Sequence, residues 1–282
     1  MTRQKHREGY RDERGAEPGK EWNEKRKSRR RRNRRKARIR FLASMLGTLL
    51  GAVLLVLVAY TALNLFCGFG KVNTQKLREQ GYPESLIALM ERNPETKDFV
   101  LDYPKYKGLE EIDISKEVTK GEIPHFLQWD ERWGYETYGS DFLAVTGCGP
   151  TSLSMVVCGL TGDTKWNPYE VAQMAEDNGY YVDGSGSSWE LMSSGAEKLG
   201  LTVSSVIFDA EHIRATLESG QPIICVMGPG DFTDAGHFLV LTGVDQEGDI
   251  ILQDPNSVER TKQHWDVQKL MNQMKNLWSY RV

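Results

Sequence analysis

The stretch "TGCGPTSL", residues 146–153, holds a cysteine whose neighbours suit a reactive thiol. Gly147 and Gly149 allow a tight turn on either side of Cys148. Pro150 lacks an N–H group and suits the first helical turn, which predicts that the thiol lies at or just before a helix N-terminus. The helix dipole and unpaired N–H groups at such a position stabilise a thiolate and lower its pKa. A buried structural cysteine in a glycine turn explains the same residues equally well.

A nucleophilic thiol needs a general base, and His237 is the best placed of the five histidines to act as one. It opens the apolar run "HFLVLTGV", which predicts a strand over residues 237–244. The glycine-rich segment "GPGDFTDAG" precedes it and predicts a flexible loop. Taken alone, a single strand histidine is more often structural, so the base needs a partner to support it.

The next apolar run, "DIILQD", predicts a second strand that pairs with the first around the turn "DQEG", residues 245–248. One register sets His237 opposite Asn256 and another sets it opposite Asp254. Both put Asp254 directly across from His237 or one diagonal away on the same face of the sheet. A carboxylate there accepts the Nδ1–H, fixes the tautomer and stabilises the imidazolium. Whether Asp254 or Asn256 orients the imidazole is left open.

Acyl transfer also needs hydrogen-bond donors for the oxyanion that forms on the substrate carbonyl. Gln128, in "HFLQWDERWGY", is a candidate side-chain amide for this purpose. The backbone N–H of Cys148 is the candidate second donor. The two residues are distant in sequence, so no local spacing links them.

Four segments together resemble a known family: "PHFLQWDERWGY", "GCGPTSLSMVVCGLTG", "GHFLVLTGVD" and "ILQDPNS". They are similar to the papain-like cysteine peptidases of the bacteriocin-processing type, cysteine peptidase family 39 and its relatives. The resemblance covers residues 124–282. It implies a papain-like fold with Cys148 as nucleophile, His237 as base, Asp254 as the residue that orients the base, and Gln128 in the oxyanion hole.

Two further sequence features bear on this resemblance. The segment "YPESLIALMERNPETKDFVLDYP" looks like one that precedes such domains in Gram-positive bacteria. The bacteriocin-processing members are fused to a transporter, whereas no GxxxxGK[ST] nucleotide-binding motif occurs in this sequence. Cleavage of a double-glycine leader is therefore not the expected reaction, and surface, wall-linked or secreted peptides are the remaining candidates.

Metal and cofactor chemistry is not expected from the cysteines. No CxxC pair occurs, which argues against a structural zinc site. Cys158 and Cys225 fall in an apolar helix and an apolar strand, and both are predicted to be core residues. We therefore expect neither a metal nor a cofactor.

The elements that position these residues follow from hydrophobic spacing and from end signals. Helices are predicted over residues 150–158, 168–177, 188–199, 210–219 and 267–275. Strands are predicted over residues 201–208, 222–228, 237–244, 249–254 and 277–282. Because the helices come mainly before the strands, the predicted class is α+β, with the nucleophile on an N-terminal helix and an antiparallel sheet at the C-terminal end.

Charge is distributed unevenly along the chain. The formal net charge is only −3, but residues 1–40 carry 18 Lys and Arg against 6 Asp and Glu. Such a split indicates an appended basic tail rather than one uniform globule. The tail is predicted to contact anionic lipid headgroups. Nucleic-acid binding is the alternative interpretation of a basic tail, and it is not expected here.

Residues 41–66 carry no charge, and they predict a transmembrane helix that precedes the folded domain. A helix of this length spans about 39 Å, more than the roughly 30 Å of bilayer hydrocarbon. A signal peptide is the alternative, but its apolar region is usually about 7–15 residues long. The basic cluster of residues 25–40 predicts a cytoplasmic N-terminus. The expected protein is thus a single-pass plasma-membrane protein with an extracytoplasmic C-terminal domain.

The sequence therefore predicts four parts: a disordered basic cytoplasmic tail (1–40), a transmembrane helix (41–66), an extracytoplasmic stalk with short helices (67–122) and a cysteine peptidase-like domain (123–282). The leading hypothesis is a membrane-anchored cysteine peptidase that hydrolyses peptide bonds of a peptide or protein substrate outside the cell. Two alternatives remain open. One is a non-catalytic module of the same fold that binds a peptide or wall fragment, and the other is an acyl transferase with the same triad.

Overall fold

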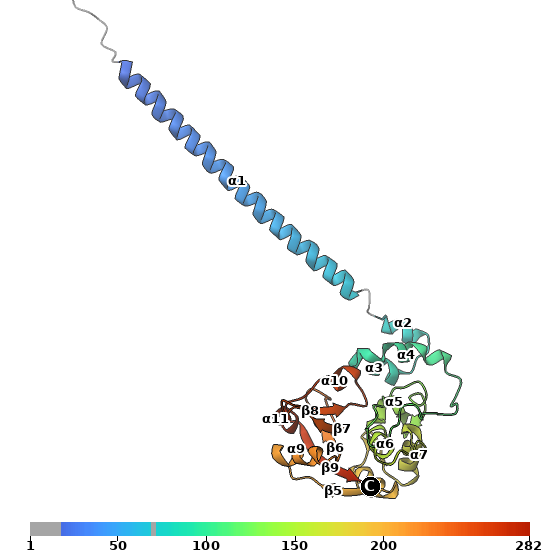
Figure 1. Ribbon diagram of the computed structural model, residues 1–282. Helices are drawn as coiled ribbons and strands as arrows, with labels where there is room; N and C mark the ends of the chain where they lie inside the picture. Colours follow the sequence, from blue (N-terminus) through green and yellow to red (C-terminus); the bar gives the residue numbers. More distant parts are fainter. Residues whose placement is uncertain (1–17, 69–71) are drawn as a thin grey trace, which may run out of the picture. The chain divides into compact units, whose positions relative to one another are not determined.

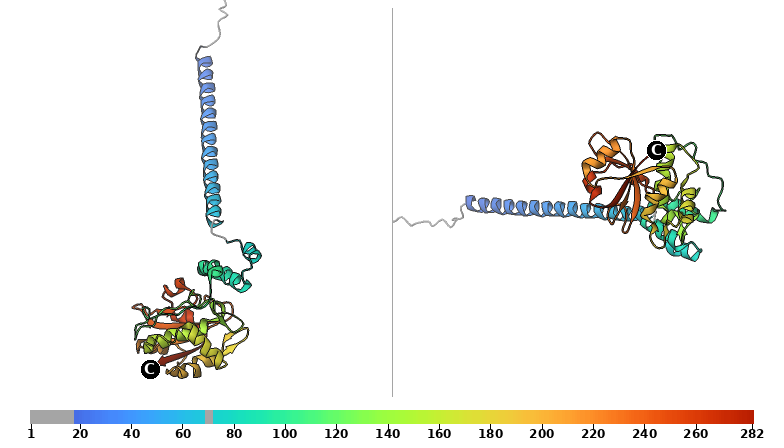
Figure 2. Two further views of the ribbon diagram at one scale, coloured as in Figure 1. Left: turned by 90° about the vertical axis from the view of Figure 1, so that its right-hand side faces the viewer. Right: turned by 90° about the horizontal axis from the view of Figure 1, so that it is seen from below.

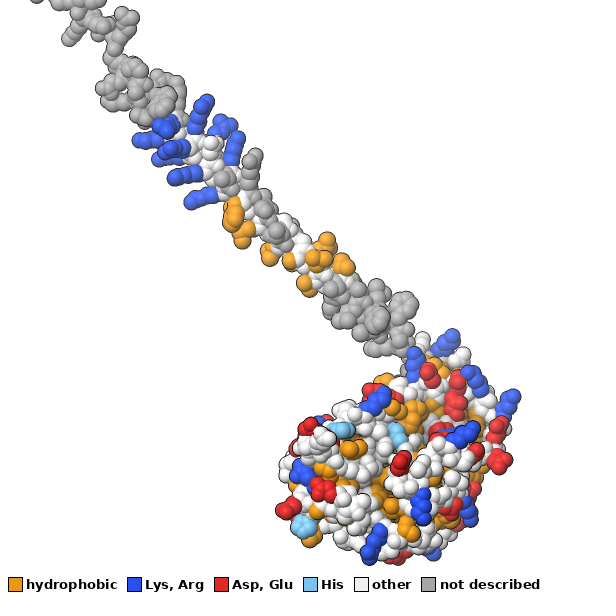
Figure 3. Space-filling model, in the orientation of Figure 1, with side chains coloured by type: hydrophobic (Ala, Val, Ile, Leu, Met, Phe, Trp, Pro, Cys, Tyr) orange, Lys and Arg blue, Asp and Glu red, His pale blue; other side chains and the backbone are white. Residues whose placement is uncertain are grey.

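A computed structural model describes residues 18–68 and 72–282. The chain divides into two units, residues 1–72 and residues 73–282, each of which is considered by itself. The first unit contains one long helix, α1 (Pro18–Gly68). Lys and Arg side chains gather on the described part of this helix around residues 26–36, as Figure 3 shows.

The predicted transmembrane helix over residues 41–66 is wrong. Within the described parts of the chain, no helix is both long and apolar enough to cross a membrane. The fold prediction is corrected in this element, and the predicted localisation, a single-pass plasma-membrane protein with an extracytoplasmic domain, is corrected with it.

The second unit begins with short helices that pack into it. These are α2 (Thr74–Glu79), α3 (Glu84–Arg92), η1 (Pro94–Thr96), α4 (Lys97–Asp102) and η2 (Tyr103–Lys105). In α3, apolar residues recur at helical spacing, and Leu86 and Ile87 are fully buried. The helix contacts α5 and β2 of the folded domain. Residues 73–122, predicted as a stalk, thus belong to the same compact unit as the rest.

Residues 137–198 form the helical half of the second unit. Its elements are β1 (Thr137–Tyr138), β2 (Asp141–Phe142), α5 (Leu143–Thr146), α6 (Cys148–Thr161), α7 (Pro168–Asp177), β3 (Tyr181–Val182), β4 (Gly186–Ser187), η3 (Trp189–Met192) and α8 (Ser194–Lys198). Helix α6 is buried over most of its length, and α7 packs along it. Asn167 caps α7 by accepting the N–H of Glu170. This half supplies the helix that begins at Cys148.

The other half is a sheet of five strands. The elements are β5 (Thr202–Ser205), α9 (Ala210–Glu218), β6 (Ile223–Met227), β7 (His237–Val244), β8 (Ile250–Gln253), α10 (Val258–Thr261), α11 (Val267–Met271) and β9 (Met274–Arg281). The strand order is β5-β9-β6-β7-β8, and every neighbouring pair is antiparallel. Figure 2 shows the helices of the first half on one side of this sheet and α9 on the other.

The sheet is covered on both faces, because alternate residues of each central strand enter different cores. In β6, Ile224 and Val226 pack with α6 and α7, while Ile223, Cys225 and Met227 pack with α9 and α11. All five residues of β6 are buried. This explains why the strand is a continuous apolar run rather than an alternating one.

The β7–β8 hairpin differs from the predicted turn. Val240 pairs with Gln253. When this register is extended along both strands, His237 lies opposite Asn256. A register shift between Leu241 and Gly243 then moves the pairing by one residue near the turn. The connection is five residues long, 245–249, because the Asp245 side chain accepts the N–H groups of Glu247 and Asp249 and holds a wider loop.

Two predicted helices are shorter than expected. The helix expected over residues 188–199 breaks at Ser193, whose ψ of −90° is not helical. The carbonyl of Met192 there accepts a hydrogen bond from the Tyr280 hydroxyl (2.8 Å). The helix expected over residues 267–275 ends at Met271, because Met274 already pairs with Met227 in the sheet. Tertiary partners override local helix propensity in both places.

Replacing Leu86 by alanine tests whether α3 is integral to the folded unit. Leu86 is fully buried, so Leu86→Ala is expected to lower the free energy of unfolding by about 2–5 kcal/mol. Leu109→Ala is the matched control, because Leu109 is 41% exposed, and it should cost less than about 1 kcal/mol. Urea denaturation of the full chain measures both values. Equal, small effects of the two substitutions would contradict the packing of α3.

Candidate active site

Cys148 is the first residue of α6, and two close contacts explain the glycines beside it. Neither Gly147 nor Gly149 has a positive φ, so backbone freedom is not what requires them. A Cβ on Gly149 would lie 2.4 Å from the Ser187 hydroxyl oxygen, and one on Gly147 would lie 2.4 Å from the carbonyl oxygen of Leu143. Glycine is therefore needed for space, and it lets β4 and α5 approach the cysteine. The Cys148 side chain remains partly exposed.

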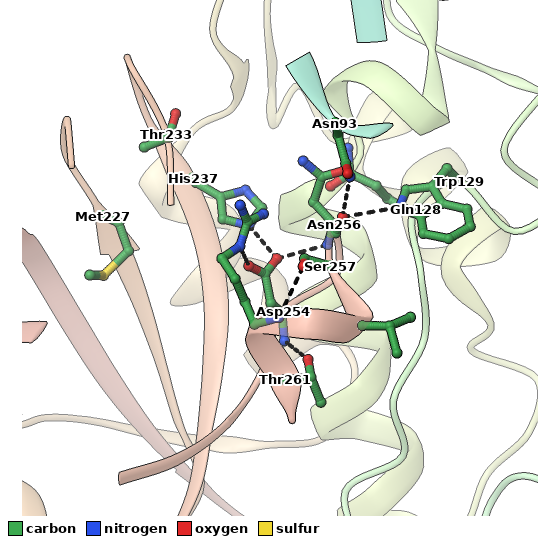
Figure 4. Close-up of polar contacts among 12 residues, drawn as sticks. Asn93, Gln128, Trp129, Met227, Thr233, His237, Asp254, Asn256, Ser257 and Thr261 are labelled. Atoms are coloured by element: carbon green, nitrogen blue, oxygen red, sulfur yellow. Dashed lines mark hydrogen bonds and ion pairs between the residues drawn. The ribbon is translucent and has the colours of Figure 1, made fainter. Parts of the chain in front are cut away.

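His237 is the first residue of β7, and it forms a buried pair with Asp254. The Nε2 atom of His237 lies 2.7 Å from Oδ1 of Asp254, as Figure 4 shows. The Asp254 carboxylate is fully buried, and His237 is 6% exposed. Asn256 does not orient the imidazole, because its side-chain oxygen accepts a hydrogen bond from Asn93 (3.2 Å).

The pairing uses a different imidazole nitrogen from the one predicted. The sequence-based expectation was that Asp254 would accept the Nδ1–H, whereas the carboxylate accepts from Nε2. Because Nε2 is bonded to Asp254, Nδ1 is the nitrogen that can form the hydrogen bond between His237 and the Cys148 thiol. In the observed register Asp254 lies diagonally across from His237, and its Oδ1 meets Nε2 of the imidazole.

The Asp254 carboxylate accepts hydrogen bonds on both oxygens. Oδ1 also accepts the backbone N–H of Asn256 (2.8 Å). Oδ2 accepts from Nε of Arg260 (2.5 Å). Burial by itself raises the pKa of Asp254, but the charge and hydrogen bond of His237, together with Arg260, hold that pKa below its usual value. The carboxylate is therefore ionised at neutral pH.

Cys148 and His237 shift each other's pKa in opposite directions. Burial raises the pKa of the Cys148 thiol, but the hydrogen bond and charge of His237 and the backbone N–H groups of Phe238 and Gly149 outweigh it and lower the pKa overall. Burial lowers the pKa of His237, but the charge of Asp254 and the contact with Cys148 raise it well above its usual value. The arrangement favours a thiolate beside an imidazolium.

Gln128 is buried and joins the two sides of the site. Its Nε2 donates to the carbonyl of Ala144 (2.7 Å), four residues before Cys148, and its backbone N–H donates to the carbonyl of Pro255 (2.7 Å). The opposite amide orientation would set two oxygens against each other, so the Ala144 carbonyl fixes which end is the NH₂ group. Its Oε1 is buried and has no hydrogen-bond partner within the described chain. Gln128 thus connects the segment before Cys148 with the residue after Asp254, and one side-chain N–H is left to donate.

The comparisons with known proteins bear on the C-terminal part of the chain. Residues 120–282 match the Peptidase_C39 like family. The chain belongs to this family. The match agrees with the resemblance to cysteine peptidase family 39, but it supports neither the membrane-anchored nor the Gram-positive part of that prediction. Membership in the Peptidase_C39 like family indicates a cysteine peptidase domain.

A solved structure that matches the chain is also described as a C39-like peptidase. It is the crystal structure of a C39-like peptidase from Bacillus anthracis, 18% identical to the present chain. The alignment covers 58% of this chain and 97% of that one, with a TM-score of 0.34. No curated protein matches the chain.

Several residues near Asp254 were not predicted from the sequence. Arg260 holds the carboxylate from α10, and His125 contacts the Asp254 backbone carbonyl through Nε2 (2.7 Å). The indole N–H of Trp129 donates to the Asn256 carbonyl (3.1 Å). No sequence pattern near the Asp-Pro pair could have identified Arg260 as a partner of the carboxylate. Across residues 18–68 and 72–282, no group of His, Cys, Asp and Glu side chains could hold a metal ion.

Alkylation by iodoacetamide tests the electrostatics of the site. Burial raises the pKa of Cys158 to about 12 and also raises that of Cys225, whereas the pKa of Cys148 is lowered. At pH 7 we expect Cys148 to react at least about 100-fold faster than the other two, with a rate that falls as the pH drops through its lowered pKa. Mass spectrometry of timed samples measures each site.

The matched control for the alkylation experiment is His237→Ala. Removing the imidazole should slow the reaction of Cys148 at pH 7 and leave that of Cys158 unchanged, because Cys158 has no contact with His237. Labelling of Cys148 as slow as that of Cys158 and Cys225 in the unmodified protein would show that the Cys148 pKa is not lowered.

Proposed function

We propose that the chain is a cysteine peptidase that hydrolyses peptide bonds, with Cys148 as nucleophile, His237 as base and Asp254 as the residue that orients the base. The observation that carries the proposal is the buried hydrogen bond between His237 Nε2 and Asp254 Oδ1 beside a thiol of lowered pKa. A perturbed cysteine, an imidazole and a buried carboxylate in contact are the elements of nucleophilic acyl transfer.

The proposed reaction follows from the protonation states of the pair. The Cys148 thiolate attacks the substrate carbonyl carbon, and the carbonyl π electrons move to the oxygen. The His237 imidazolium then gives its Nδ1 proton to the leaving amine as the C–N bond breaks. Water attacks the resulting thioester, His237 takes one of its protons, and the acid product leaves. Asp254 stays ionised throughout and stabilises the imidazolium.

The oxyanion needs two donors, and the site offers two candidates. Gln128 uses one side-chain N–H on Ala144 and has a second N–H to donate. Cys148 occupies the first position of α6, where a helix provides no internal acceptor for the backbone N–H. We propose that these two N–H groups bind the developing negative charge. The bond to Ala144 holds the Gln128 amide in place before substrate arrives.

The proposed substrate is a peptide or protein. The chain from residue 71 onward carries 18 Lys and Arg against 33 Asp and Glu. Such an excess of acidic groups raises the local concentration of cationic partners, so basic peptides are the first class to test.

Substituting the nucleophile tests the proposed function directly. The unmodified full chain is expected to cleave members of a mixed peptide library under reducing conditions. Cys148→Ala should abolish the cleavage while the protein remains folded, because the nucleophile is removed and alanine fits the same helical position. Cys158→Ala is the control and should retain cleavage, because Cys158 donates to Trp166 away from the site. Turnover by Cys148→Ala equal to that of the unmodified chain would refute the proposal.

A second substitution tests the oxyanion donors. Gln128→Ala removes one donor that acts mainly in the transition state, so kcat is expected to fall by about 10²–10³-fold with little change in KM. Gln268→Ala is the control, because Gln268 is exposed on α11. Steady-state kinetics on one cleaved peptide gives both constants. A fall in kcat below threefold for Gln128→Ala would remove Gln128 from the proposed mechanism.

A further inference from the structure

A segment outside the family match contacts the turn that carries Asp254. The match begins at residue 120, whereas Asn93 lies between α3 and η1, and Glu95 lies in η1. We call residues 254–261 the Asp254 turn. Glu95 and Asn93 are about 160 residues away from this turn in the sequence, and Figure 4 shows Asn93 directed at it.

Glu95 binds the middle of the Asp254 turn through both carboxylate oxygens. Oε2 accepts the backbone N–H of Val258 (2.8 Å) and that of Glu259 (3.2 Å). Oε1 accepts the hydroxyl of Ser257. A carboxylate that takes donors from three consecutive residues fixes their backbone, because moving any one of them breaks a charge-assisted hydrogen bond.

Asn93 binds the start of the same turn. Its Nδ2 donates to the backbone carbonyl of Asn256 (2.5 Å) and contacts the side-chain oxygen of Asn256 (3.2 Å). Its Oδ1 accepts the N–H of Glu95 (3.1 Å), which ties the two residues together. Asn93 is 8% exposed, so an unsatisfied amide there would be costly.

The contacts continue from Glu95 to the carboxylate of Asp254. Ser257, bonded to Glu95, accepts the backbone N–H of Arg260 (3.0 Å). Arg260 in turn binds Oδ2 of Asp254 through Nε. The backbone N–H of Asn256, whose carbonyl is held by Asn93, binds Oδ1. The partners of both Asp254 oxygens are thus joined by hydrogen bonds to turn residues that Asn93 and Glu95 contact.

We propose that Asn93 and Glu95 are positioning residues for the active site: they hold the Asp254 turn so that the Asp254 carboxylate stays against His237. This inference rests on the proposed peptidase function. Neither residue touches the reacting atoms, and each acts through the turn. Residues 93–95 thus support the active site although they lie outside the family match.

Loosening the turn has a definite electrostatic consequence. The charge of Asp254 raises the pKa of His237, and protonated His237 lowers the pKa of Cys148. If Asp254 moves away from the imidazole, the pKa of His237 falls and that of Cys148 rises. The groups facing His237 are Asp254 and Cys148, and Arg260 faces the far oxygen of Asp254. The Cys148 thiolate and the His237 imidazolium then coexist over a narrower pH range, because the lower limit of that range rises and its upper limit falls.

Kinetics of the full chain gives the first test. Glu95→Ala and Asn93→Ala are expected to lower kcat about tenfold or more, since small displacements of catalytic groups are costly, with KM within about twofold. Glu91→Ala is the matched control, because it removes the same charge from α3, where among the described residues Glu91 forms an ion pair with Arg78 at 3.9 Å. It should leave both constants unchanged. Equal kcat values for Glu95→Ala and Glu91→Ala would overturn the proposal.

The pH dependence of Cys148 alkylation gives a second test that needs no substrate. In Glu95→Ala the acid-side midpoint should move upward by about one pH unit, so that alkylation slows about tenfold on that limb. A purely structural role would lower the unfolding midpoint and leave this profile unmoved. Glu95→Gln keeps one acceptor oxygen without the charge, and it should show a smaller shift in a stably folded protein.

The two tests separate this inference from the proposed function. If the unmodified chain cleaves no peptide, the peptidase proposal fails, while the alkylation profiles still decide the role of Glu95. A shifted profile in Glu95→Ala and a smaller shift in Glu95→Gln support positioning. Profiles identical to that of the unmodified chain in both variants refute it, whatever the peptidase assay shows.

Discussion

The site depends on one interaction: a fully buried carboxylate, Asp254, that is kept ionised. A buried charge is stable only when it is paired and hydrogen bonded, and Asp254 has His237 and the Asn256 N–H on one oxygen and Arg260 on the other. Its negative charge raises the pKa of His237, which in turn lowers the pKa of Cys148. The pKa of the Cys148 thiol is thereby lowered through a carboxylate that is fully buried.

The fold brings these groups together through two halves that meet at a covered sheet. Helix α6 packs on β7, so the first residue of the helix lies near the first residue of the strand. Both faces of the central strands are buried, which fixes their register, because a slip of one residue would exchange the two cores. That register places Asp254 diagonally across from His237. The turn beyond it is held by residues from the N-terminal helices, so the unit that positions the site is larger than the matched family region.

The sequence predicted much of this arrangement, but it did not predict the residues that hold Asp254 in place. The spacing of glycine, cysteine and proline predicted a helix start at Cys148, and strand alternation brought His237 and Asp254 to one face. The imidazole nitrogen was assigned incorrectly, since neither residue types nor strand register determines which ring nitrogen faces the carboxylate. Arg260 and Glu95 could not be predicted, because their contacts arise from a short turn and from chain segments far apart in sequence. The transmembrane prediction rested on the length of the uncharged stretch 41–66 and on the basic cluster before it, and no described helix satisfies it.

The protonation state of His237 tests the central claim most directly. A nuclear magnetic resonance titration of the imidazole nitrogens in the resting full chain follows that one residue without any substrate. Because the ionised Asp254 and the Cys148 thiolate both favour the charged form, His237 should remain an imidazolium at pH 7 and lose its proton only well above its usual pKa. A neutral His237 at pH 7, titrating at or below the pKa of a free histidine, would contradict the account.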